Sequence, residues 1–134
     1  MSLDIQQTEK EGITILNLKG RITVGPEATV LREKVQELTA AKKVSIILNL
    51  ADVDYIDSTG LGALVMAATT LKKVDGVAKL LNLSKRTIEL LVMTKLATIF
   101  EIFGDEQHAV NSFFPDREIK RFDILSFVQS SKKA

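Results

Sequence analysis

The chain has 134 residues, 46% of them hydrophobic, and a formal net charge of +1 from 18 basic and 17 acidic residues. This length and apolar content suffice for one folded domain with a buried core and exclude a disordered chain. The chain lacks the excess of basic residues that is typical of direct nucleic-acid binding. The absence of cysteine excludes disulfides, thiolate metal sites and a cysteine nucleophile.

The N-terminal residues are too polar for a signal peptide, and no apolar run approaches the ~20 residues that a membrane-spanning helix needs. We therefore expect a cytoplasmic protein without membrane contact.

The first part of the chain alternates between strand and helix patterns. Two strands, 3–8 and 13–19, flank a Glu-Lys-Glu-Gly turn and are joined too tightly to be parallel neighbours. A helix over 26–41 begins with proline, which suits the first helical position, and has apolar residues at spacings of three and four. The nearly continuous apolar run at 44–50 is typical of a strand covered on both faces, or of a parallel one.

The alternation continues to residue 114, with Ser84 and Asp105 as helix caps and Pro115 as a stop. The predicted elements are a helix over 58–73, a strand over 77–82, a helix over 84–93, a strand over 98–103 and a helix over 105–114. Alternating strands and helices predict an α/β fold. We expect a single domain over residues 1–114, with a mixed four- to six-stranded sheet and about four helices, in which Leu48 and Leu64 are buried.

Residues 115–134 form a C-terminal extension with a mixed pattern. Phe122, Leu125 and Val128 fit one face of a helix, whereas residues 122–124 fit a strand, and the last five residues resemble a frayed end. Two interpretations stay open: the extension packs on the domain, or it docks a partner.

The junction near residue 58, where a strand pattern gives way to a helix pattern, is the most informative part of the chain. Ser58 follows Asp57 at a position where a helix N-cap is expected, and a serine there satisfies a backbone N–H that the helix leaves unpaired. Gly60 and Gly62 lie in the first turn, although each glycine costs about 1 kcal/mol of helix propensity relative to alanine. Either tight packing on the sheet or a surface that another molecule approaches closely must offset this cost.

No catalytic motif is complete around this serine. A hydrolase elbow needs glycine two residues before and two after the nucleophile, but Ile56 occupies the first position. His108 is the one histidine, and no pattern in the sequence places it near Ser58, so we interpret it as a surface residue. Gly60-Leu-Gly62 is only part of a dinucleotide fingerprint, and no Gly-Lys-Ser/Thr phosphate loop is present. We therefore expect neither enzymatic activity nor a cofactor.

The carboxylates before the serine do not form a predicted metal site either. Asp52, Asp54 and Asp57 lack the further ligands and the final glutamate of an EF-hand, so we expect solvated carboxylates on an irregular segment. A hydroxyl at a helix N-terminus can instead accept a phosphate, whose ~1.5 to 2 negative charges the helix dipole favours. Ser58 is thus a candidate for regulatory phosphorylation.

The residues around Ser58 resemble a known signature. Residues 53–64, Val-Asp-Tyr-Ile-Asp-Ser-Thr-Gly-Leu-Gly-Ala-Leu, are similar to the strand–Asp-Ser-x-Gly-Leu–helix signature of the STAS domain, anti-sigma factor antagonist family. The similarity runs from about residue 3 to residue 114 and includes 80–84, 96–103 and 109–113.

The resemblance implies a function for Ser58. In that family the matching serine is phosphorylated by a partner that is both an anti-sigma factor and an ATP-dependent serine kinase. The unphosphorylated antagonist binds this partner and frees a sigma factor; phosphorylation breaks the complex, and a separate phosphatase restores it. By this resemblance we expect a monomer or weak dimer whose partner-binding residues are Thr23, Asp57, Ser58, Thr59, Gly60, Leu61 and Gly62.

Thr23 departs from the family pattern. Three positions after Gly20 the family often has an acidic residue near the phosphoacceptor, and this chain has threonine there. The difference bears on the efficiency of phosphorylation and on the identity of the kinase.

Two other functions stay open. One is a STAS scaffold in a larger sensory assembly, modified at Ser58 or Thr59 without directly freeing a sigma factor. The other is a STAS domain that binds a small molecule or nucleotide, although the sequence has no evident phosphate cradle.

Overall fold

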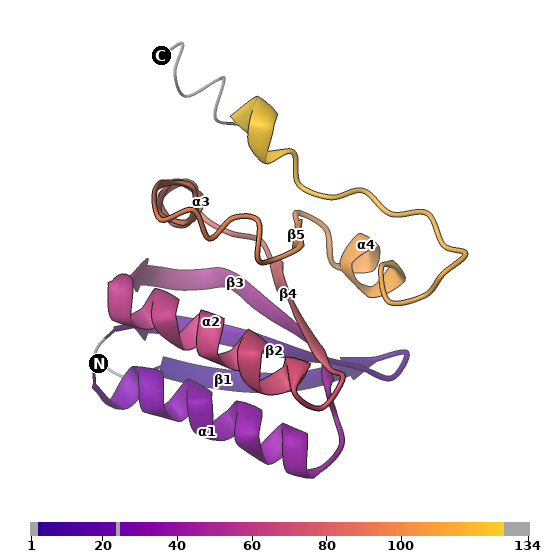
Figure 1. Ribbon diagram of the computed structural model, residues 1–134, viewed down its shortest axis with the longest axis horizontal. Helices are drawn as coiled ribbons and strands as arrows, with labels where there is room; N and C mark the ends of the chain where they lie inside the picture. Colours follow the sequence, from indigo (N-terminus) through magenta and orange to yellow (C-terminus); the bar gives the residue numbers. More distant parts are fainter. Residues whose placement is uncertain (1–2, 24, 128–134) are drawn as a thin grey trace.

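One mixed five-stranded sheet organises the chain (Figure 1). The structure, a computed structural model, describes residues 3–23 and 25–127. The strands follow chain order across the sheet: β1 (Leu3–Lys10), β2 (Ile13–Ile22), β3 (Ser45–Ile56), β4 (Val77–Leu81) and β5 (Ile102–Phe103). The hairpin pair β1–β2 is antiparallel, and every later neighbouring pair is parallel. This confirms the expected mixed α/β sheet.

Within the described residues, α1 (Pro26–Ala40), α2 (Ser58–Lys72) and α3 (Lys85–Met93) connect the parallel strands, and α4 (Glu106–Asn111) follows β5. Together they cover both faces of the sheet. Figure 1 shows α1 and α2 lying side by side against the sheet. The main core joins the sheet to α1, α2 and α3, whereas a second, smaller core lies between the opposite face and α4.

The central strand β3 explains the continuous apolar run in the sequence. Ile46 and Leu48 belong to the main core, while Ile47 between them belongs to the second core under α4. Alternate side chains of a strand point to opposite faces, so a strand covered on both sides needs apolar residues throughout. Leu48 and Leu64 both have no exposed surface, which confirms that they are core residues.

Several predicted boundaries were wrong. The strands predicted at 3–8 and 13–19 extend to Lys10 and Ile22. β3 continues to Ile56 because it keeps pairing with β2, so Asp52 and Asp54 lie on a strand rather than on an irregular segment. The strand predicted at 98–103 is reduced to Ile102–Phe103, since a turn precedes it in which the Ile99 N–H donates to Leu96 O at 3.1 Å. Helix α4 ends at Asn111, before the predicted residue 114.

The described part of the C-terminal extension packs along β5 and on the main core. The Phe122 N–H donates to Ile102 O at 2.8 Å, and the Phe122 and Ile124 side chains pack against the main core. Arg121 pairs with Glu101 at 2.6 Å. Burial raises the pKa of Glu101, but hydrogen bonds from Arg121 and Lys79 outweigh it and hold that pKa below its ordinary value.

A short helical turn ends the described part of the extension. The Asp123 carboxylate accepts the Ser126 N–H at 3.0 Å, which begins a helical segment at residues 124–127. Leu125 therefore lies on a helix, as one of the two predicted patterns required. Val128 and the expected frayed end lie outside the described residues.

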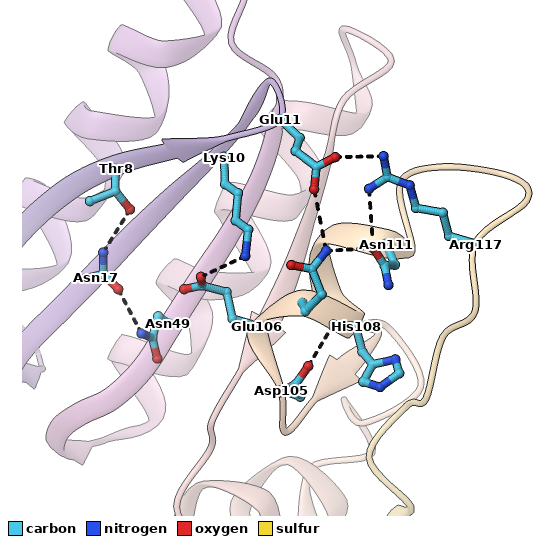
Figure 2. A network of polar contacts seen from close by, with 11 residues as sticks. Thr8, Lys10, Glu11, Asn17, Asn49, Asp105, Glu106, His108, Asn111 and Arg117 are labelled. Atoms are coloured by element: carbon cyan, nitrogen blue, oxygen red, sulfur yellow. Dashed lines mark hydrogen bonds and ion pairs between the residues drawn. The ribbon is translucent and has the colours of Figure 1, made fainter.

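The β1–β2 hairpin is tied to α4 and to the extension by polar contacts (Figure 2). Glu11 at the turn pairs with Arg117 of the extension at 2.7 Å and accepts a hydrogen bond from Gln107 of α4 at 3.5 Å. Lys10 and Glu106 lie 3.9 Å apart. These contacts join the β1–β2 turn to α4 and to the start of the C-terminal extension.

No helix within residues 3–23 and 25–127 is long and apolar enough to cross a membrane.

The register of α2 on the sheet can be tested by truncating its core face. Leu64→Ala should lower the free energy of unfolding by about 2 to 5 kcal/mol, because it removes a fully buried side chain and leaves a cavity. Met66→Ala, on the same helix but 53% exposed, should change it by less than about 0.5 kcal/mol. Urea denaturation measures both; similar small losses would mean that the apolar stripe of α2 faces solvent.

Candidate functional site

The candidate site lies where β3 ends and α2 begins. β3 ends at Ile56 and α2 begins at Ser58, so a single residue turns the chain from strand to helix at the carboxyl edge of the parallel strands. Binding sites of α/β sheets are typically at this edge. The Ser58 and Thr59 side chains are exposed, whereas Gly60 and Leu61 are buried.

The helix cap is Asp57 rather than Ser58, which corrects the sequence interpretation. Asp57 has the extended backbone of an N-cap (φ −98°, ψ −176°), and its carboxylate accepts the Gly60 N–H at 2.8 Å. The Asp57 N–H donates to Ile22 O at 3.4 Å, which keeps this residue aligned with the end of β2. Ser58 is therefore the first helical residue, and its hydroxyl has no hydrogen-bond partner among the described residues.

The two glycines of the first turn have different physical roles. A Cβ atom on Gly60 would lie 1.8 Å from Ile22 O and 2.6 Å from Ile22 C, so only glycine allows α2 to pack on the end of β2. A Cβ atom on Gly62 would have nothing within 4 Å. Packing on the sheet thus accounts for Gly60 but not for Gly62, which is exposed on the outer side of the turn.

Gly62 lines a shallow groove of about 300 Å³ between α1 and α2. Thr59 and Ala63 of α2 also line it, opposite Thr29 and Arg32 of α1. The missing side chain at Gly62 leaves this groove open to the backbone of α2. Such a surface permits the close approach of another chain.

Thr23 lies next to this junction. It directly follows Ile22, which pairs with Ile56 and whose carbonyl oxygen receives the Asp57 N–H beside Gly60. Thr23 is half-buried. The end of β2 and the first turn of α2 are therefore neighbours, and Thr23 directly follows the end of β2.

A second groove adjoins Ser58 and involves residues that sequence reasoning missed. It measures about 430 Å³ and lies between the β3–α2 junction and α3. Its lining residues are Tyr55, Ile56, Asp57 and Ser58 on one side, and Arg86, Glu89, Leu90 and Met93 on the other. The Arg86 guanidinium carbon lies 5.1 Å from the centre of the Tyr55 ring, and Met93 is 79% exposed. No pattern in the sequence connects these α3 residues to Ser58.

His108 is not placed to act on Ser58. It lies on α4, which packs on the face of the sheet opposite to α2, so the sheet separates the imidazole from the hydroxyl. The expectation of an ordinary surface residue was only partly right, since His108 is half-buried and its Nδ1 is a buried atom without a hydrogen-bond partner in the described chain. General base catalysis needs a base within hydrogen-bond reach, which His108 does not provide here.

The described residues also contain no group of three or more histidine or acidic side chains that could hold a metal ion. Asp52 and Asp54 are exposed on β3, and the Asp57 carboxylate accepts a backbone hydrogen bond as the helix cap.

Alanine substitutions separate the two glycines. Gly60→Ala should lower the free energy of unfolding by about 1 to 3 kcal/mol, since the added methyl group collides with the Ile22 backbone. Gly62→Ala should raise it by about 0.4 to 1 kcal/mol, because alanine favours the helix and meets open space. Chemical denaturation of both variants measures the difference, and equal effects would contradict the packing described here.

The cap assignment has its own test. Asp57→Ala should lower the free energy of unfolding by about 0.5 to 2 kcal/mol, whereas Asp57→Asn should retain most of it because asparagine is an equally good cap. Ser58→Ala should change it by less than about 0.5 kcal/mol, as expected for an exposed residue outside the cap. If Ser58→Ala lowered the free energy of unfolding as much as Asp57→Ala does, Ser58 and not Asp57 would be the helix cap.

Comparisons with known proteins agree on the family. Residues 4–109 match the family model described as STAS domain. The anti-sigma-B factor antagonist of Bacillus subtilis (strain 168) is 37% identical over 110 residues, which cover 82% of this chain and 99% of that protein. The anti-sigma F factor antagonist of Paenibacillus polymyxa is 23% identical over 110 residues, covering 82% of this chain and 94% of that protein.

Solved structures share the fold. An anti-sigma factor antagonist from Mycobacterium paratuberculosis aligns with a TM-score of 0.71 at 16% identity, covering 82% of this chain and 92% of that one. The antagonist SpoIIAA in its unphosphorylated form aligns with a TM-score of 0.63 at 21% identity, covering 82% of this chain and 97% of that one. The family match and the Bacillus subtilis relative together show that this chain belongs to the STAS domain family, among the anti-sigma factor antagonists.

Proposed function

We propose that this protein is a partner switch controlled by phosphorylation of Ser58. In its unphosphorylated form it binds an anti-sigma factor that is also a serine kinase, and it thereby releases a sigma factor. Phosphorylation of Ser58 by that kinase ends the binding, and a separate phosphatase restores it. The protein itself is not an enzyme and acts in the cytoplasm as a monomer or weak dimer.

The main support for this proposal is the Ser58 hydroxyl, which is exposed and has no hydrogen-bond partner among the described residues. Because Asp57 caps α2, the Ser58 side chain can be modified without removing the hydrogen bond that starts the helix. A phosphate there adds ~1.5 to 2 negative charges in the first helical turn, where the helix dipole favours them. The modification therefore changes the surface and leaves the fold intact.

A protein of similar fold exists in a phosphorylated form, which supports the proposal. SpoIIAA has been solved both unphosphorylated and in a phosphorylated form, and the two align with this chain at TM-scores of 0.63 and 0.64. A fold that accommodates the phosphate in that protein is a reason to expect the same of this one.

The proposed partner surface consists of the exposed residues of the first turn and of the groove beside them. Ser58, Thr59 and Gly62 are exposed there, whereas Gly60 and Leu61 are buried and hold the turn in place. Asp57 maintains the turn as its cap. Thr23, directly after β2, is proposed to influence the rate of phosphorylation, because a carboxylate added there would alter the charge around the phosphoacceptor.

Charge substitutions at Ser58 test the switch. Ser58→Ala should bind the kinase as tightly as wild type and should not be phosphorylated. Ser58→Asp should bind about tenfold more weakly or worse, because it places an unpaired charge within the contact. Calorimetric titration of the kinase with each variant measures binding, and mass spectrometry after incubation with ATP identifies the modified residue.

Two further variants control for charge and for fold. Thr69→Asp adds the same charge to the exposed part of α2, three turns away, and should bind like wild type. Gly62→Ala should weaken binding although it stabilises the fold, since its methyl group fills the open groove. Unchanged binding of Ser58→Asp, or phosphate found on Thr59 instead of Ser58, would reject the proposed switch.

A further inference from the structure

We propose that Arg86 binds the phosphoryl group on Ser58, which makes α3 the second half of the switch surface. The inference rests on the proposed phosphorylation of Ser58. Both residues line the groove of about 430 Å³ between the β3–α2 junction and α3, although 28 positions separate them in the sequence. The ligand is a phosphomonoester, whose oxygens the planar guanidinium can bind through two parallel N–H donors.

Arg86 is the one cation among the described residues that line this groove. Its guanidinium lies over the ring of Tyr55, with the carbon 5.1 Å from the ring centre, and it makes no ion pair with any carboxylate of the described chain. A contact with an exposed aromatic ring is weaker than charge-assisted hydrogen bonds to a phosphate. A phosphoryl group on Ser58 therefore competes successfully with Tyr55 for this side chain.

The other charged groups that line the groove are negative, so binding of a phosphate there depends on Arg86. Asp57 and Glu89 also line it, and both carboxylates repel a phosphate. Without Arg86 the phosphoryl group would face two negative charges and no positive one from these walls. With Arg86 it gains a partner on α3 that bridges the groove.

Phosphorylation then alters more than the charge of one residue. When Arg86 moves to the phosphate, it leaves the Tyr55 ring uncovered and occupies the opening between α2 and α3. A partner that contacts both walls, including the exposed Met93, meets a different shape as well as a different charge.

The experiment uses the full chain with phosphoserine incorporated at position 58 during translation, so that no kinase is needed. Phosphorus NMR follows the second ionisation of the phosphate, which is ordinarily near pH ~6. A bound guanidinium favours the dianion, so Arg86→Gln should raise this pKa by about half a unit or more. Glu89→Gln should lower it, because a repelling carboxylate is lost.

Lys85→Gln is the matched control. It removes the same charge from the adjacent, exposed position of α3, which does not line the groove, and should leave the pKa within about 0.2 units. Arg86→Lys should retain part of the shift. Equal pKa values for wild type and Arg86→Gln, or an equal rise with Lys85→Gln, would overturn the proposal, since the phosphate would then sense only the overall charge.

Tyr55 provides a second measurement, because it is the one tyrosine of a chain without tryptophan. Acrylamide quenching of its fluorescence should increase on phosphorylation of the wild type and stay constant in Arg86→Gln, which has no guanidinium to withdraw. An identical change in both proteins would contradict the inference. Neither measurement involves the kinase, so a failure of the kinase to bind would reject the proposed function and leave this result standing.

Discussion

The site depends on the contact between the first turn of α2 and the backbone at the end of β2. Gly60 lies so close to the Ile22 carbonyl that an added Cβ atom would be 1.8 Å from its oxygen. This close approach fixes the height and angle at which α2 leaves the sheet, and with them the positions of Ser58 and Thr59. The helix accepts an unfavourable residue because the alternative is a collision with main-chain atoms that cannot move aside.

Because of this contact, the residue that stabilises the start of α2 differs from the residue that is proposed to be modified. Asp57 is held at the end of β2 and caps the helix, so the hydroxyl of Ser58 has no structural task. Leu61 and Leu64, which are buried in the main core, hold the rest of α2 to the sheet. A modification of Ser58 therefore changes the electrostatics of an anchored surface, and the proposed switch requires no rearrangement of the fold.

The sequence predicted the sheet well because its signals are local. The apolar run of β3 and the stripe of α2 reflect burial of the same residues, Leu48 and Leu64, that the structure places in the core. The cap was misplaced by one residue because aspartate and serine are equally good caps. What decides between Asp57 and Ser58 is the continued pairing of β3 with β2 as far as Ile56, which is a tertiary effect that no local pattern records.

The α3 wall of the site was missed for a related reason. Arg86, Glu89 and Met93 have the pattern of a solvated helix face, and nothing in their spacing connects them to Ser58. The connection is made by the parallel order β3–β4–β5, which places the crossover helix α3 beside the end of β3. A motif around the phosphoacceptor identifies where chemistry happens, but the groups that respond to the new charge are selected by topology. The response of this surface is therefore a property of the assembled sheet edge, and homologues with the same serine motif can differ in it through α3 alone.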